Sequence, residues 1–234
     1  MTAGTTVGLV AIGQTPRDDL TREFAGLWND AFAIVEEGAL NGLGAAEIAR
    51  LEPRRGESDL ITRLADGRSV YVSHDRLTPY VQSAIDRVCR AGADIVIVAC
   101  TGRFAELRAD VPVVQPFDVL EHAVAPILPP GKTLLLVVPT EGQAGEAAER
   151  WKGRGYRPEP ILVASPFADH AALRRDLDDA AKRVDGIVFD CFGFGSEFLE
   201  STPGRRGKPV FIARVLIARL LCGIFPTPAL AVRT

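Results

Sequence analysis

Residues 95–104 read IVIVACTGRF, a continuous apolar run that ends at Cys100 and then breaks at a Thr-Gly pair. A continuous rather than alternating apolar run is typical of a parallel strand that is covered on both faces. Residues 186–195, GIVFDCFGFG, repeat the arrangement and place Cys191 at the corresponding point. The two stretches therefore predict two buried parallel strands, each with a thiol where the chain leaves its sheet.

Similar apolar runs recur along the chain, and helical segments separate them. We expect strands at residues 7–12, 95–99, 134–138, 161–164, 187–189 and 210–212, and shorter strands at 33–35, 70–72 and 111–114. Apolar residues three or four positions apart predict helices at 76–91, 143–153 and 168–184. Alternation of strands and helices favours an α/β fold with parallel sheets.

The order of the strands suggests two similar lobes, each a parallel sheet flanked by helices. In the first lobe a strand at residue 7 leads to the strand that ends in Cys100, and in the second a strand at residue 134 leads to the one that ends in Cys191. Open parallel sheets bind ligands beyond the carboxyl ends of their strands. We therefore expect a ligand cleft between the lobes, lined by these strand ends.

The lobe boundaries follow from the distribution of proline. Four of the 16 prolines lie in residues 115–131, which we interpret as the linker. The last helix, expected at 214–225, would return to the first lobe. This assigns residues 1–115 plus 213–234 to the first lobe and residues 116–212 to the second.

Composition excludes several classes of protein. The chain has 234 residues, 47% hydrophobic and 24% charged, as in ordinary globular proteins. A net charge of -3 with dispersed basic residues offers no electrostatic footprint for nucleic acid. The apolar segments are too short, or too interrupted by Arg214 and Arg219, to span a bilayer, and the N-terminus lacks the basic region of a signal peptide. We therefore expect a cytoplasmic protein with free thiols.

The four cysteines differ in context. Cys89 lies on the apolar face of an expected helix and Cys222 follows a nearly all-apolar stretch, so we interpret both as core residues. Cys100 and Cys191 can also be small core hydrophobes. Each, however, is followed within two residues by glycine, and each loop is expected to lead into a helix whose N-terminal amides can bind an anion and lower the thiol pKa. Together they favour a shared function.

The stretch IGQTPRDDL, residues 12–20, contains the start of a helix and one residue, Arg17, that the helix start does not explain. Thr15 can cap a helix that begins near Pro16, and the two aspartates at 18 and 19 complement the positive end of the helix dipole. Arg17 remains. It can form a bidentate pair with a substrate carboxylate, or it can be an ordinary structural ion pair.

Other chemical candidates are weaker. His74 lies near a strand end, where a lone histidine is more often structural than catalytic. No spacing of histidines and carboxylates indicates a metal, and the glycines at 193 and 195 match only part of a dinucleotide fingerprint, so we expect neither a metal nor a nucleotide cofactor. Asp190 ends an apolar strand, where a backbone amide or Arg214 is expected to satisfy its charge.

Five stretches together resemble the AroM protein family over nearly the whole chain. They are IGQTPRDD (12–19), VSHDRLTPYVQSAID (72–86), VACTGRF (98–104), DCFGF (190–194) and VLIARLL (215–221). That family is similar in turn to the aspartate/glutamate/hydantoin racemase superfamily, whose two α/β lobes enclose a cleft with one cysteine from each lobe. The resemblance therefore implies the arrangement expected from the strands.

The resemblance also implies a reaction. In amino-acid racemases Asn-Thr follows the first cysteine and Thr-His the second, whereas this chain has Thr101-Gly102 and Phe192-Gly193. This chain has both cysteines but lacks the Asn-Thr and Thr-His residues that follow them in amino-acid racemases, which argues against an amino-acid substrate. Phe192 would give the substrate apolar contacts or simply pack.

The leading hypothesis is a cofactor-independent isomerase or racemase of a small carboxylate compound, with Cys100 and Cys191 as acid and base. The expected substrate-binding residues are Gln14, Thr15, Arg17, Thr101, Gly102, Thr140, Phe192 and Gly193. A decarboxylase, an isomerase that forms a thiol adduct, and a non-catalytic regulatory binder remain alternatives. Racemase-like relatives are often dimers, so we expect a homodimer.

Overall fold

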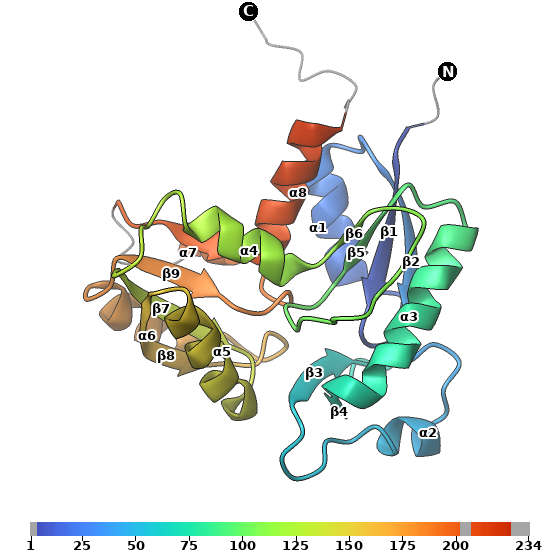
Figure 1. The fold of residues 1–234 in the computed structure, drawn as a ribbon, viewed down its shortest axis with the longest axis horizontal. Coiled ribbons are helices and arrows are strands. Elements are labelled where there is room, and N and C mark those ends of the chain that lie inside the picture. The colour runs from blue at the N-terminus through green and yellow to red at the C-terminus, as the bar shows by residue number, and fades with distance from the viewer. Residues whose placement is uncertain (1–3, 202–206, 226–234) are drawn as a thin grey trace, which may run out of the picture.

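A computed structural model describes residues 4–201 and 207–225, and Figure 1 shows two parallel sheets with helices around them. The first sheet has the strand order β2-β1-β5-β6, built from β1 (Thr6–Ala11), β2 (Ala33–Gly38), β5 (Ile95–Val98) and β6 (Val113–Val114). The second has the order β8-β7-β9-β10, built from β7 (Thr133–Val138), β8 (Arg157–Val163), β9 (Gly186–Phe189) and β10 (Val210–Ile212). Every neighbouring pair in both sheets is parallel.

The two sheets share one topology. In each, the first strand in the chain pairs with the second on one side and the third on the other, and the fourth strand adds beside the third. Cys100 and Cys191 both lie two residues beyond that third strand, β5 in one sheet and β9 in the other. The predicted α/β fold with two similar lobes is confirmed, and the thiols occupy equivalent positions.

The helices of the described residues are α1 (Asp18–Trp28), α2 (Ala45–Ala49), α3 (His74–Arg90), α4 (Pro116–Val124), α5 (Glu141–Gly153), α6 (Ala171–Ala181), α7 (Glu197–Ser201) and α8 (Ala213–Ile224). The helices predicted near Pro16 and at 76–91, 143–153, 168–184 and 214–225 are present within three residues of their expected bounds, whereas α2 and α4 were not predicted. The linker expected at 115–131 is in part a helix, because Pro116 occupies the first position of α4, where its missing N–H costs nothing. Among the described residues no helix is long and apolar enough to cross a membrane.

The lobes are joined by a shared core. Helix α8 packs against α1 and α4 (Figure 1). The indole N–H of Trp28 donates to the carbonyl of Ala218 at 3.0 Å. One cluster of buried side chains contains Leu9 and Phe24 together with Leu136. Because this cluster runs through both lobes, the lobe boundaries at 115/116 and 212/213 stay a prediction.

A hairpin outside the two sheets is the main departure from the predicted elements. The strand expected at 70–72 is β4 (Ser69–Ser73), and it pairs antiparallel with β3 (Asp59–Arg63) rather than joining a parallel sheet. The amide of Gln14 donates to the carbonyl of Arg63 at 3.1 Å, which fixes the hairpin to the end of β1. Strand β3 also contacts α5 of the second sheet, so the hairpin reaches across the lobes.

Candidate active site

A small cavity lies where the carboxyl ends of the two sheets meet, and both Cys100 and Cys191 line it. The first lobe also contributes Arg17 and the residues around Cys100, while the second contributes Phe192 and Gly193. Its volume is only about 30 Å³, and since one water needs about 10–15 Å³ by this measure, it has room for about two waters. The described conformation is therefore closed, and a substrate needs the walls to move.

The two thiols are held in the same way. The amide of Gly102 donates to the sulfur of Cys100 at 3.2 Å, and the amide of Gly193 donates to the sulfur of Cys191 at 3.4 Å. A side chain at Gly193 would collide with Pro166, whose Cγ would lie 2.5 Å from the added Cβ. Glycine at that position lets the loop approach closely, and each sulfur receives one N–H that would support a thiolate.

The expectation of lowered thiol pKa values is wrong. Burial raises the pKa of Cys100 to about 12 and that of Cys191 to about 11, and the nearby Asp190 carboxylate acts in the same direction. The helix expected directly after Cys100 is absent, because the chain next becomes helical at α4, and α7 begins six residues after Cys191. Without a helix N-terminus beside the sulfur, loss of water contact dominates.

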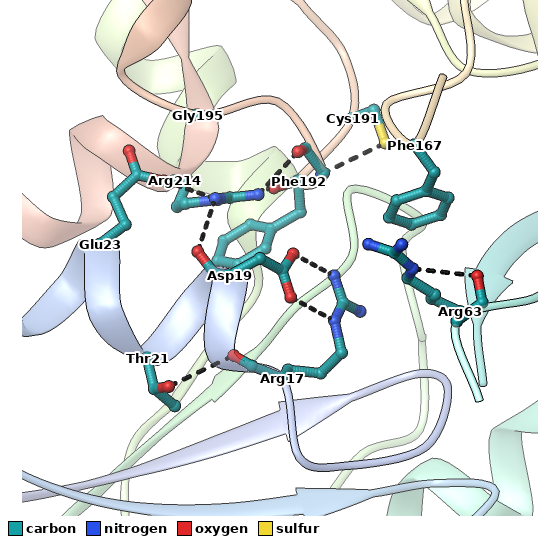
Figure 2. A network of polar contacts seen from close by, with 12 residues as sticks. Arg17, Asp19, Thr21, Glu23, Arg63, Phe167, Cys191, Phe192, Gly195 and Arg214 are labelled. Atoms are coloured by element: carbon teal, nitrogen blue, oxygen red, sulfur yellow. Dashed lines mark hydrogen bonds and ion pairs between the residues drawn. The ribbon is translucent and has the colours of Figure 1, made fainter. Parts of the chain in front are cut away.

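Arg17 lines the cavity and is also a structural ion pair. Its side chain donates through Nε and Nη2 to the two carboxylate oxygens of Asp19, at 2.8 and 2.7 Å, and is almost fully buried (Figure 2). Burial raises the pKa of the Asp19 carboxyl, but the hydrogen bonds and charge of Arg17 outweigh this effect and hold that pKa below its ordinary value. The guanidinium also lies 5.5 Å from the ring centre of Phe167. Arg17, which was expected to bind the substrate carboxylate, is therefore already paired with the carboxylate of Asp19.

Four of the expected binding residues, Gln14, Thr15, Gly102 and Thr140, lie outside the cavity. Gln14 hydrogen-bonds the carbonyl of Leu40 and the amide of Ala65 with its side chain, so it holds loops together. Thr15 does not cap α1, which begins at Asp18; its hydroxyl instead accepts from Asn41 at 2.7 Å. Thr140 caps α5.

The cap of α5 is made by the hydroxyl of Thr140, which accepts from the amide of Gln143 at 3.1 Å. Thr101 lines the cavity and donates to the carbonyl of Asp190 at 3.2 Å, which links the two thiol loops. Gly102 faces a second hollow of about 240 Å³ together with His74. His74 stacks on Phe104 with ring centres 4.6 Å apart and does not line the thiol cavity.

Asp190 finds partners other than the expected ones. One carboxylate oxygen accepts from Nη2 of Arg150 at 2.9 Å and from the indole of Trp151 at 3.2 Å. The other oxygen has no partner among the described residues. Arg214 instead donates to the carbonyls of Phe192 and Gly193, at 3.0 and 2.7 Å, and pairs with Glu23 of α1 (Figure 2).

Sequence reasoning missed part of the cavity wall. Three residues of β3 line it, as do Gln143 at the start of α5 and Phe167 in the loop after β8. Thr62 and Phe167 are the important omissions because they contribute a hydroxyl and an aromatic ring. Phe167 follows the predicted strand at 161–164 by three residues, so the end of that strand was a local signal that was overlooked. The hairpin that carries Thr62 was not predicted, so the sequence held no local signal for Thr62.

Comparison with solved structures shows which proteins share this fold. The maleate isomerase Iso from Pseudomonas putida S16 matches with a TM-score of 0.61 at 14% identity, covering 94% of this chain and 93% of that one. The Picrophilus torridus aspartate racemase matches with a TM-score of 0.59 at 13% identity, covering 94% of each chain. An arylmalonate decarboxylase matches with a TM-score of 0.59 at 16% identity, covering 96% of each chain.

This chain shares its fold with these three proteins. A search of the curated proteins finds no match to this chain. The model of the AroM protein family matches residues 7–225, nearly the whole sequence. The chain therefore belongs to the AroM protein family.

Proposed function

We propose that this protein is a cofactor-independent isomerase or racemase of a small carboxylate compound. The observation that carries the proposal is that Cys100 and Cys191, at equivalent positions of two similar lobes, line the same cavity. Racemisation needs a base on one face of the reacting carbon and an acid on the other. Two thiols presented by two lobes meet that need, and the fold is shared with racemases and an isomerase.

The proposed reaction begins with one thiol ionised. That thiolate takes the proton from the carbon next to the substrate carboxylate, which leaves an enediolate. The opposite thiol then gives its proton to the other face of the same carbon, and the two sulfurs end with their protonation states exchanged. Arg17 would hold the carboxylate and stabilise the enediolate charge, and the amides of Gly102 and Gly193 would stabilise whichever sulfur is ionised.

The remaining residues divide by what they touch. Thr101, Phe192 and Gly193 line the cavity, so we assign them to substrate contact. Gln14 bonds to Ala65 just after β3 and Thr140 caps α5, two elements that line the cavity, so we assign both residues to positioning, together with Thr15 and Gly102. Arg17 must exchange its present partner, Asp19, for the substrate carboxylate.

Hydrogen exchange in D₂O tests the proposal. Both enantiomers of alanine, aspartate, lactate, malate and mandelate are incubated with the protein, and deuterium at the α carbon is followed by NMR alongside chiral chromatography. We expect at least one acid to exchange and to racemise, and we expect Cys100→Ser and Cys191→Ser each to abolish racemisation. A single variant that racemises at nearly the wild-type rate would show the two-thiol mechanism to be wrong.

A non-catalytic binder of small molecules is the second candidate. The raised pKa values of both thiols and the closed cavity favour it, because neither feature suits a resting acid–base catalyst. The same panel separates the two candidates. An acid that binds, detected by calorimetry, and shows no exchange at any pH up to 10 would support the binder.

We also propose that the protein acts in the cytoplasm as a homodimer. The location is proposed from the apolar segments and the N-terminal sequence. The dimer is proposed because racemase-like proteins are often dimers. Light scattering after size-exclusion chromatography tests the assembly: a dimer has twice the 25.1 kDa mass of the chain. A mass equal to that of one chain at micromolar concentration would contradict it.

A further inference from the structure

One wall of the thiol cavity carries a hydroxyl that bonds to nothing in the described part of the chain. Thr62 of β3 is 1% exposed, and its Oγ1 has no hydrogen-bond partner there. It lines the cavity together with Cys100, Cys191 and Arg17. A buried hydroxyl without a partner is destabilising, so an unpaired hydroxyl on a residue that lines a cavity points to a ligand.

The surrounding chain makes room for this hydroxyl. A side chain at Gly13 would clash with Oγ1 of Thr62 and with the carbonyl of Arg63. Valine has nearly the shape of threonine and would fill the same place without burying an unpaired oxygen. The fold therefore accommodates a hydroxyl that contributes nothing to its stability.

A second uncharged polar group lies in the opposite lobe. Gln143, in the first turn of α5, lines the same cavity and also the second hollow beside it. Its backbone amide is bonded to Thr140, while its side-chain amide makes no hydrogen bond with the described residues. The cavity is thus lined by a residue with an unpaired hydroxyl and by a residue with an unpaired carboxamide, from β3 and α5, which contact each other.

We propose that Thr62 and Gln143 bind an uncharged hydrogen-bonding substituent of the substrate, such as a hydroxyl, carbonyl or amide group. The inference rests on the proposed function only in placing the substrate carboxylate at Arg17. Both side chains can donate and accept, and neither carries charge, so a second ionised group placed against them would be buried without compensation. The substrate class is then a monocarboxylate with a neutral polar substituent, for which 2-hydroxy acids are the simplest representatives.

The test uses pairs of acids that differ by one hydroxyl: lactate against propionate and mandelate against phenylacetate. Calorimetry measures their binding to the wild type, to Thr62→Val and to Thr62→Ser, which keeps the hydroxyl. Loss of one hydrogen bond to a hydroxyl corresponds to about a 10- to 100-fold loss of affinity. We expect Thr62→Val to lose that factor for the hydroxy acids alone, and Thr62→Ser to retain most of it.

The melting temperature distinguishes a hydroxyl of Thr62 that binds a ligand from one that stabilises the fold. If the hydroxyl serves only a ligand, Thr62→Val melts at the wild-type temperature or above it, since an unpaired buried oxygen has been removed. A markedly lower melting temperature for Thr62→Val than for Thr62→Ser would mean that the hydroxyl has a structural partner, and would overturn the inference. Gln143→Met, at the half-buried site in α5, is the second variant, with the same expected loss for hydroxy acids.

The outcomes separate this inference from the proposed function. Hydroxy acids that bind through Thr62 without any proton exchange would contradict catalysis and support the inference. Racemisation that depends on both cysteines, with equal binding of acids that have and lack the hydroxyl, would support catalysis and contradict the inference. If no hydroxy acid binds the wild type more tightly than its partner, the substrate class is wrong.

Discussion

Burial decides the ionisation of the two thiols, although arginine side chains near both favour the thiolate. Cys100 and Cys191 each receive one backbone N–H, but burial outweighs that bond and the pKa of each rises, to about 12 and about 11. Arg17 is the cation on the cavity wall, and its bidentate bond to Asp19 offsets much of its charge.

The raised pKa values predict how the thiols react with pH. A thiol with a pKa of about 11 has about one thiolate in a thousand molecules at pH 8, so its alkylation rate should rise about tenfold per pH unit from 8 to 10. An ordinary thiol levels off above pH 9, because its pKa is about 8.5. Iodoacetamide labelling of Cys191 followed by mass spectrometry, with glutathione as control, checks this. A plateau near pH 8 would contradict the account.

At the scale of elements, the cavity is closed by parts that belong to neither sheet. The hairpin β3–β4 covers one side, and the loop after β8 places Phe167 on another. Phe167 has Arg17 at 5.5 Å and Arg63 at 5.6 Å from its ring centre, and both charges contact the ring (Figure 2). On its outer side lies a hollow of about 480 Å³, which Gly193 also lines. Phe167 thus separates a space too small for substrate from one large enough.

Truncation of Phe167 should connect these two spaces. We expect Phe167→Ala to speed alkylation of Cys191 by about tenfold or more at pH 8, since the thiol would no longer depend on local opening of the loop. Phe167→Leu is the matched control, because it keeps most of the bulk and loses the ring. Equal rates for Phe167→Ala and wild type would show that the substrate enters elsewhere.

At the scale of the whole molecule, Arg214 connects the lobes at the site. It stands at the start of α8, pairs with Glu23 of α1, and donates to the carbonyls of Phe192 and Gly193 beside the second thiol. Its side chain is nearly fully buried. A buried charge with partners in two separate segments, α1 and the Cys191 loop, couples the position of that loop to the packing between the lobes.

Removal of Arg214 should therefore destabilise the whole fold. Breaking a buried ion pair by removing one partner costs about 3–5 kcal/mol, and we expect a loss of that size in the free energy of unfolding for Arg214→Met. Arg22→Ala is the control, because its pair with Asp18 is exposed and should contribute less than about 1 kcal/mol. Urea denaturation measures both. Equal stability of the two variants would contradict the role of Arg214.

The local patterns in the sequence account for what could be predicted. Continuous apolar runs gave both parallel sheets and the equivalent positions of the two cysteines, because that pattern is a direct result of burial on two faces. The segment DLITR of β3 was missed, since it is short and polar at both ends. The partners of Asp190 and Arg214 lie 40 and 191 residues away, and no local pattern reports contacts of that separation.

The stereochemistry of exchange in D₂O tests most directly whether the thiols act on opposite faces of one substrate. It uses a chiral acid that the wild type racemises, with each enantiomer incubated separately with Cys100→Ser and Cys191→Ser. If each thiol serves one face, each variant should still exchange one enantiomer with retention, and the two variants should exchange opposite enantiomers. Exchange of the same enantiomer by both variants, or racemisation by either, would contradict the account.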